Sequence, residues 1–228
     1  MEQITSVTNI KIKNLLSLRK KSERYNERKF LVEGLHLTVE AYKNNLLETV
    51  LSTDESLLKQ FDDAKQILVS DAVINKLSTT TTPQNIIGVV KMKESLFRKS
   101  NQYVVLDDVN DPGNFGTIIR TSLALGVKDI IVSPNTVDEY NEKTLRATQG
   151  AIFKANIIRM NLEDAYKKFN DYLKARQLAK AKNNETNVDE IVNVEESENI
   201  DEHPIEVYKK PGIEEDDGKE DNKPFSIS

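Results

Sequence analysis

The chain has 228 residues, of which 38% are hydrophobic and 30% are charged, and its formal net charge is −5. Because the chain contains no cysteine, disulfides, cysteine nucleophiles and thiolate zinc sites are excluded. It contains only two histidines, which nearly excludes a metal site built from histidines. We therefore expect no metal. The sequence has no run of roughly eighteen uncharged apolar residues, so we expect no membrane span and a cytoplasmic location.

The charge is distributed unevenly along the chain. Residues 1–177 carry 26 Lys and Arg against 22 Asp and Glu, a net charge of +4. Residues 178–228 carry 6 against 15, a net charge of −9. The mild average acidity therefore describes neither part, and the first part is weakly basic.

Residues 1–95 alternate between helical and extended patterns. Ile12, Leu15 and Leu16 recur at helical spacing and predict a first helix, which a basic run follows. Further on, the pattern predicts strands at 30–34, 48–52, 66–70 and 86–90, and helices at 35–44, 54–65 and 71–78. Asp54 is the expected N-cap of the second of these helices. This alternation predicts a small α/β domain over residues 1–95.

A polar, charged connection at 91–102 leads to a second alternating region, which we place at residues 101–178. Strands are expected at 103–109, 129–133 and 154–159, and helices at 114–126, 141–150 and 161–178. Three strand–helix units in succession imply a parallel sheet. After Leu178 the periodicity stops, and we expect residues 179–228 to form a mostly disordered acidic tail. A short strand at 205–208 has no evident partner.

The most informative stretch lies between the first two strands of the second region. A buried strand leads into residues 110–114, Asn-Asp-Pro-Gly-Asn, where Pro112 fixes φ and Gly113 would permit the positive φ of a tight turn. We expect a helix to start at Asn114. Ligands of open α/β sheets bind beyond the carboxyl ends of the strands, so a site is expected at this turn.

Arg120 is the candidate functional side chain of this helix. It lies outside the apolar stripe that the helical wheel predicts to face the sheet, namely Phe115, Ile118, Ile119, Ser122, Leu125 and Gly126. Gly116 and Ala124 lie one turn away on its row, and their small size would leave room for a phosphate or ribose. The alternative is that Asn114 is only an N-cap and Arg120 only a solvated side chain.

Residues 111–126, DPGNFGTIIRTSLALG, resemble the first motif of the SpoU (TrmH-type) RNA 2′-O-ribose methyltransferases, a branch of the knotted SPOUT superfamily. The family's RNA-substrate-binding domain is similar to two stretches of this sequence, FLVEGLHLTVEA and TTPQNIIGVV. The segment that follows the first motif in the family is similar to SPNTVDEYNEKTLRATQGAIF. The resemblance covers roughly residues 3–177, with its motifs in the family's order. It implies an α/β substrate-binding domain followed by a SPOUT-like methyltransferase domain.

The resemblance also implies an activity, the transfer of a methyl group from S-adenosylmethionine to a ribose 2′-hydroxyl of ribosomal or transfer RNA. In the family, the first-motif arginine acts on that hydroxyl and the first-motif asparagine shapes the site, and these roles fall on Arg120 and Asn114. An arginine is ordinarily too strongly protonated to act as a base, and that role would require a bound phosphate or other help, so stabilisation of charge is the expected role of Arg120.

The sequence departs from the family pattern after residue 150. The family's two later cofactor-binding motifs, one of a Gly-Asn-Glu type and one containing Ser-Leu-Asn, are not visible. We therefore expect an incomplete parallel sheet without the knot, leave the cofactor-binding residues unassigned, and expect a truncated, inactive chain. A homodimer would lack the same motifs, whereas a complete paralogue would supply them. A non-catalytic RNA-binding protein and a product without a retained role are the alternatives.

Several charged residues are candidates for contact with RNA. Arg24, Arg28 and Lys29 belong to the basic run before the first domain's strand 30–34, and Glu33 ends that strand. Lys143 and Arg146 lie on the helix expected at 141–150. For each of them, the alternative is a solvated helix face or an ordinary turn residue.

Overall fold

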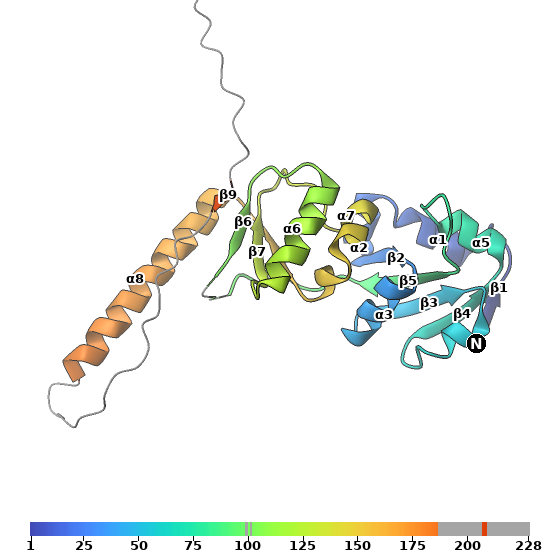
Figure 1. Cartoon of the computed structure of the whole chain (residues 1–228), viewed down its shortest axis with the longest axis horizontal. Helices are drawn as coiled ribbons and strands as arrows, with labels where there is room; N and C mark the ends of the chain where they lie inside the picture. The colour runs from blue at the N-terminus through green and yellow to red at the C-terminus, as the bar shows by residue number, and fades with distance from the viewer. Residues whose placement is uncertain (99, 101, 187–206, 209–228) are drawn as a thin grey trace, which may run out of the picture.

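The computed structural model describes residues 1–98, 100, 102–186 and 207–208. The described chain forms two α/β domains placed end to end, and a long helix projects from the second (Figure 1). In the described part of the chain, no helix combines the length and the apolar character needed to cross a membrane.

The N-terminal domain is built on a five-stranded mixed sheet with the order β1-β4-β3-β5-β2. The strands are β1 (Glu2–Ile4), β2 (Lys29–Glu33), β3 (Leu47–Ser52), β4 (Lys65–Val69) and β5 (Ile86–Lys91). β1, β4 and β3 run parallel, whereas β5 pairs antiparallel with both β3 and β2. The expected strands are confirmed, and β5 is an interior strand, as its unbroken apolar run requires.

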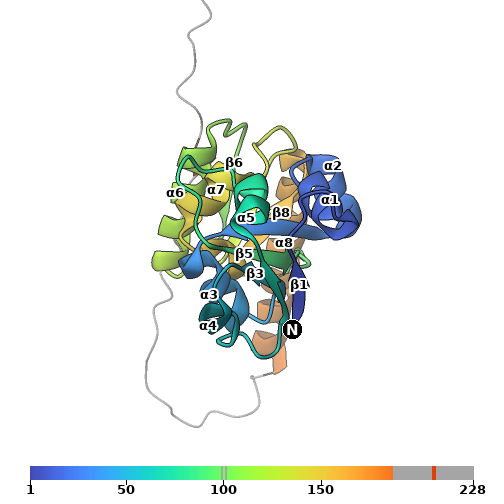
Figure 2. The same ribbon diagram turned by 90° about the vertical axis from the view of Figure 1, so that its right-hand side faces the viewer.

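Helices cover both faces of this sheet (Figure 2). They are α1 (Ile10–Ser17), α2 (Lys21–Glu27), α3 (Leu35–Lys43), α4 (Glu55–Leu58) and α5 (Asp71–Leu77). α1 and α5 pack on one face through Ile12 and Ile74, and α3 and α4 pack on the other through Leu37 and Leu58. Asp54 caps α4 as predicted, since its carboxylate accepts a hydrogen bond from the Ser56 amide at 2.8 Å.

Three features of this domain differ from the expectation, the first being that the basic run after α1 forms a separate helix, α2. The helix predicted at 54–65 ends at Leu58, because turns formed by Phe61 and Ala64 follow it. The three-residue strand β1 was not predicted, since a segment this short carries no readable periodicity.

The second domain is a four-stranded, fully parallel sheet with the order β8-β7-β6-β9. Its strands are β6 (Val104–Leu106), β7 (Asp129–Val132), β8 (Asn156–Arg159) and β9 (Val207–Tyr208). α6 (Pro112–Ala124), α7 (Glu142–Thr148) and the short 3₁₀ helix η1 (Ala151–Phe153) pack on one face, and α8 (Leu162–Thr186) packs on the other. The expected parallel sheet is confirmed, and β6 is the partner of the predicted strand at 205–208.

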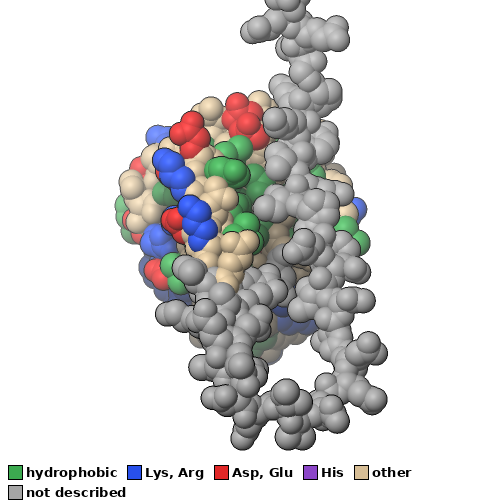
Figure 3. Space-filling view, turned by 90° about the vertical axis from the view of Figure 1, so that its left-hand side faces the viewer, with side chains coloured by type: hydrophobic (Ala, Val, Ile, Leu, Met, Phe, Trp, Pro, Cys, Tyr) green, Lys and Arg blue, Asp and Glu red, His purple; other side chains and the backbone are tan. Residues whose placement is uncertain are grey.

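α8 continues past residue 178, where we expected the last helix to end. Ala165 and Phe169 anchor its first turns on the sheet, next to Val105 and Ile158. The remainder projects from the molecule (Figure 1), and apolar side chains gather on the surface at this end (Figure 3). Apart from α8 and β9, the predicted acidic tail lies outside the described residues, as does any knot formed by it.

One hydrophobic core runs through both domains. Phe30 and Leu37 of the first domain belong to the same buried cluster as Phe115 and Phe153 of the second. The ring of Phe30 lies 4.6 Å from that of Tyr140 and 6.5 Å from that of Phe153, measured between ring centroids. The domains therefore form one packed body, because separating them would expose aromatic side chains that are buried at their interface.

Candidate RNA-binding and catalytic site

The candidate site begins where β6 leads into α6. α6 starts at Pro112 rather than at Asn114, because Asp111 is the N-cap and accepts a hydrogen bond from the Asn114 amide at 2.7 Å. Proline suits the first helical turn, since its fixed φ is helical and no amide hydrogen is needed there. Our expectation of a positive φ at Gly113 was wrong, because Gly113 lies within the helix.

Asn114 and Arg120 both lie on the exposed surface of α6. Six residues separate them, which corresponds to roughly 9 Å along a helix and about 120° around it. Arg120 makes no hydrogen bond or ion pair with any residue that the structure describes. Its guanidinium is thus available to an anion or a ribose.

A neighbouring helix, α7, fills the space on one side of the row of small residues beside Arg120. Gly116 is buried, and a Cβ atom placed on it would lie 2.5 Å from the Cβ of Ala147 and 2.6 Å from the carbonyl oxygen of Thr144. The expectation that Gly116 leaves room for another molecule is therefore wrong. The glycine instead allows α6 and α7 to approach closely, while Ala124 remains exposed.

Gly116→Ala is expected to lower the free energy of unfolding by about 1–3 kcal/mol, since α6 and α7 would have to separate. The clash involves backbone as well as side chain, so a change of rotamer cannot relieve it. Chemical denaturation measures the loss. Ala124→Val adds two methyl groups at an exposed position of the same helix and is the matched control, with an expected loss below about 1 kcal/mol. Equal losses in the two variants would contradict the packing role of Gly116.

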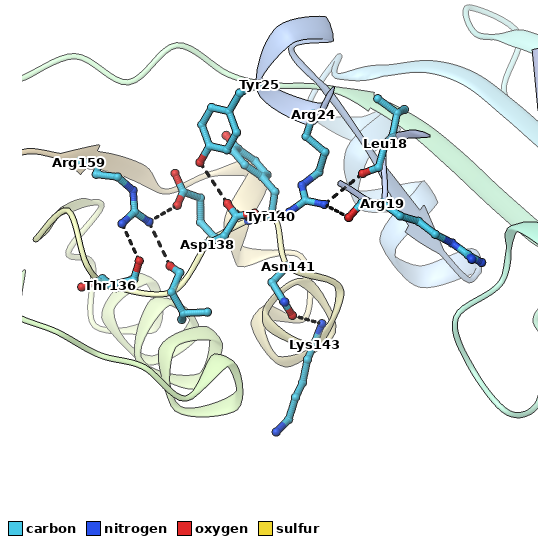
Figure 4. Close-up of polar contacts among 12 residues, drawn as sticks. Leu18, Arg19, Arg24, Tyr25, Thr136, Asp138, Tyr140, Asn141, Lys143 and Arg159 are labelled. Carbon is cyan, nitrogen blue, oxygen red and sulfur yellow. Dashed lines mark hydrogen bonds and ion pairs between the residues drawn. The ribbon is translucent and has the colours of Figure 1, made fainter. Parts of the chain in front are cut away.

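Arg24, which we expected to contact RNA, is buried between the two domains (Figure 4). Its guanidinium donates hydrogen bonds to the carbonyl oxygens of Leu18 at 3.1 Å and Arg19 at 2.7 Å, and forms an ion pair with Asp138. The Tyr25 hydroxyl donates to the other Asp138 oxygen at 3.1 Å. This guanidinium is therefore engaged by protein groups rather than free to bind a phosphate, and its role is to join the domains.

Arg159, at the end of β8, fixes the same loop from the other side (Figure 4). Its guanidinium donates to the carbonyl oxygens of Ser133 at 3.1 Å, Thr136 at 2.7 Å and Val137 at 3.0 Å, and pairs with Glu139. The loop between β7 and α7 is thus held by one arginine from each domain. Arg159 was not predicted, because an arginine at a strand end carries no distinctive sequence signal.

The other basic candidates are closer to the surface. Arg28 is exposed at the left-handed end of α2, with φ of 53°. Lys29 is half-buried and pairs with Glu48 at 2.7 Å. Lys143 lies 3.5 Å from Asp111 in an exposed pair at the start of α6, and Arg146 is exposed on α7. Of these four basic residues, only Lys143 lies next to Asp111 in the turn of the first motif.

Glu33 organises a loop. Its carboxylate accepts hydrogen bonds from the hydroxyls of Ser78 and Thr80, both at 2.7 Å, and from the amides of Thr79 and Gln84, both at 3.1 Å. Partial burial alone would raise the pKa of Glu33, but these hydrogen bonds favour the charged form and lower the pKa below its ordinary value. The carboxylate is thus occupied by residues 78–84.

Glu33→Gln is expected to lower the free energy of unfolding by about 1–3 kcal/mol at neutral pH, because acceptors for these donors are lost or weakened. A lowered pKa in the folded state stabilises the protein above the ordinary pKa of about 4.3, and this contribution is lost as the pH falls through the lowered value. The difference between wild type and variant should therefore shrink below about pH 4. Denaturation at several pH values measures it. Glu27→Gln, at an exposed glutamate, should show little change at any pH.

Comparison with known proteins identifies both domains. Residues 101–202 match the model of the SpoU rRNA Methylase family, and residues 9–88 match that of the MRM3-like substrate binding domain. An AdoMet-bound rRNA methyltransferase from Sinorhizobium meliloti is 32% identical and superposes with a TM-score of 0.65, over 73% of this chain and 67% of that one. This chain belongs to the SpoU rRNA methylase family.

Two curated relatives carry the same resemblance. The chain is 36% identical over 165 residues to the 23S rRNA (guanosine(2553)-2′-O)-methyltransferase RlmP of Bacillus subtilis. This alignment covers 71% of the present chain and 66% of RlmP. The chain is 31% identical over 160 residues to the mitochondrial rRNA methyltransferase 3 of Homo sapiens, covering 63% of itself and 38% of that protein. The chain thus spans less than two thirds of the length of either relative.

S-adenosylmethionine is the cofactor of the SpoU family. Of the two cavities that we describe, one of 440 Å³ lies between the domains and one of 330 Å³ lies around Arg98 and Lys128. Neither is lined by Asn114 or Arg120, which stand on an exposed helix surface. The described residues beside the first motif therefore do not enclose the cofactor.

Proposed function

We propose that this chain, contrary to the inactivity expected from its missing later motifs, acts on ribosomal or transfer RNA as a ribose 2′-O-methyltransferase with S-adenosylmethionine as the methyl donor, in the cytoplasm. The observation that supports this most is Arg120, which is exposed and unpaired among the described residues and belongs to the first motif of a SpoU-family domain. The match of residues 9–88 to a substrate-binding domain supports RNA as the substrate.

The chemistry explains why an unpaired arginine is needed there. A ribose 2′-hydroxyl is a weak nucleophile, because its proton is held until a very high pH. As the oxygen takes the methyl group, this proton must pass to a phosphate oxygen or to water, and negative charge develops on the ribose oxygen as the proton leaves. The Arg120 guanidinium stays protonated and would donate hydrogen bonds to that oxygen or to the adjacent phosphate. S-adenosylmethionine supplies the electrophilic methyl group when bound. Asn114 would position the ribose near the start of α6.

Binding experiments test the RNA part of this proposal. We expect ribosomal RNA to bind in a filter-binding assay with an affinity that falls as salt rises, because phosphate contacts release counterions. Arg120→Ala should reduce affinity only modestly, since one contact among several is lost. Affinity that does not respond to salt would argue against phosphate contacts.

A second function, RNA binding without catalysis, is supported by the open setting of Asn114 and Arg120 and by the missing later motifs. Calorimetric titration with S-adenosylmethionine separates the two functions. Saturable binding by this chain alone favours the methyltransferase. Binding that appears only after a complete paralogue is added favours a paired enzyme, while a homodimer that binds no cofactor favours the RNA-binding protein.

A further inference from the structure

A groove of about 440 Å³ lies between the two domains, on the side of α7 opposite to α6. Thr144 and Ala147 of α7 face Gly116 of α6, whereas Glu142 and Arg146 of the same helix line the groove. The other wall comes from the end of α1, the end of β2 and the turn after α5. The volume is in the range of 300–1,000 Å³ that is typical of ligand pockets. We call this feature the interdomain groove.

The lining of the interdomain groove combines apolar side chains with two exposed guanidinium groups. Leu31, Leu77 and Leu145 are among its apolar residues. Arg19 is fixed in the first domain's wall, where it donates to the carbonyl oxygens of Lys76 at 2.9 Å and Ser78 at 2.8 Å. Arg146 is exposed in the α7 wall and makes no hydrogen bond or ion pair through its guanidinium with the described residues. Unstacked bases lie on aromatic side chains or on arginine guanidinium planes, and the groove lining includes both kinds of group, in Tyr140 and the two arginines.

The polar groups of the interdomain groove also suit a nucleobase. Glu33 also lines the groove and keeps its negative charge, but its carboxylate oxygens already accept four hydrogen bonds from the loop 78–84. The Thr79 hydroxyl and the Glu142 carboxylate are exposed and have no hydrogen-bond partner among the described residues. A hydroxyl and a carboxylate can read the donors and acceptors on the edge of a base.

The groove is also close to the proposed catalytic helix. α7 lies between α6 and the first domain (Figure 1), and its Lys143 reaches Asp111 at the start of α6. A helix with its side chains is about 10–12 Å wide. A single RNA strand can cross that width within a few nucleotides, with Lys143 beside its path.

We propose that the interdomain groove binds one unpaired nucleotide of the substrate RNA, a short distance along the strand from the nucleotide presented to Arg120. Its base lies on the apolar lining and its phosphate is held by Arg19 and Arg146. This inference rests on the proposed function, since it names how that RNA is recognised. It would give the substrate-binding domain a direct part in selecting the target nucleotide.

Three variants test the groove with a fluorescent pool of single-stranded RNA of random sequence, on the order of ten nucleotides long. Arg146→Glu reverses a charge in the groove, and Thr79→Trp fills the groove without changing charge. Lys174→Glu makes a matched charge reversal on α8, which projects away from the groove (Figure 1). We expect the two groove variants to lose roughly tenfold or more in affinity and the control to lose less than about twofold.

The outcomes separate the groove from the proposed function. Loss in both groove variants, with a smaller salt dependence only for Arg146→Glu, supports the inference. Wild-type affinity in both, or an equal loss in Lys174→Glu, contradicts the groove but leaves an RNA methyltransferase intact. A wild-type chain that binds no RNA contradicts both. Should Thr79→Trp fail to fold, as judged by its unfolding midpoint, Arg146→Ala provides the second variant and should also weaken binding.

Discussion

Asp138→Ala is expected to lower the free energy of unfolding by about 3–5 kcal/mol, because it leaves the Arg24 guanidinium buried without its counter-ion. Both side chains of the pair are buried, with 10% of Arg24 and 8% of Asp138 exposed. The carboxylate also accepts hydrogen bonds from the Tyr25 hydroxyl and the Tyr140 amide, so these donors lose their partner too. Chemical denaturation, followed by circular dichroism, measures the effect.

Two further variants show whether the buried charge is the cause. Replacing both partners, in Arg24→Met with Asp138→Leu, should recover a large part of the loss, since no unpaired charge then remains. Lys59→Ala breaks an exposed pair with Glu55, whose atoms lie 3.0 Å apart, and should cost no more than about 0.5 kcal/mol. A double variant that is less stable than Asp138→Ala alone would show that the specific ion pair, rather than relief of an unpaired charge, holds the domains together.

Phe30→Ala is expected to lower the free energy of unfolding by about 3–5 kcal/mol, as much as Asp138→Ala. The ring is 2% exposed and packs against Tyr140 and Phe153 of the second domain, so its removal leaves a cavity at the junction. Because the core is continuous, we expect both domains to lose stability together in a single transition, as followed by denaturation with two probes.

The control for this variant is Leu96→Ala, at a leucine that is 68% exposed, which should change the free energy of unfolding by less than about 0.5 kcal/mol. If Phe30→Ala uncoupled the domains into two separate transitions, the junction would be an ordinary domain contact and not part of a shared core. An unchanged midpoint would contradict the packing role of Phe30 altogether.

The order of strands and helices could be read from the sequence because it depends on local patterns. The cap at Asp54 and the inward-facing Phe115 and Ile119 follow from residue type and helical spacing, and the structure confirms them. The burial of the last residues that the helical wheel places toward the sheet could not be predicted in the same way. Leu125 is 76% exposed, because α6 ends at Ala124 and the helical spacing that would place this side chain on the sheet no longer applies.

The contacts between the two domains could not be predicted from the sequence. Arg24 and Asp138 are 114 residues apart, and a basic run on a helix looks the same whether it faces RNA or a carboxylate of the next domain. Gly116 likewise looks like open space on a helical wheel, since the wheel does not show that α7 lies against it. The candidate site on α6 stays a prediction, and which of its neighbours are available to a ligand depends on tertiary packing.

Transfer of labelled methyl groups from S-adenosylmethionine to ribosomal RNA tests the central proposal most directly. We predict that the wild-type chain places the label on a ribose 2′-oxygen and that Arg120→Ala reduces the rate by roughly 100-fold or more, while RNA affinity changes little. Arg120→Lys, which keeps the charge but not the planar fork, should recover only part of the rate. Label that appears at the same rate without Arg120, or RNA that binds tightly and gains no label, would contradict the proposal.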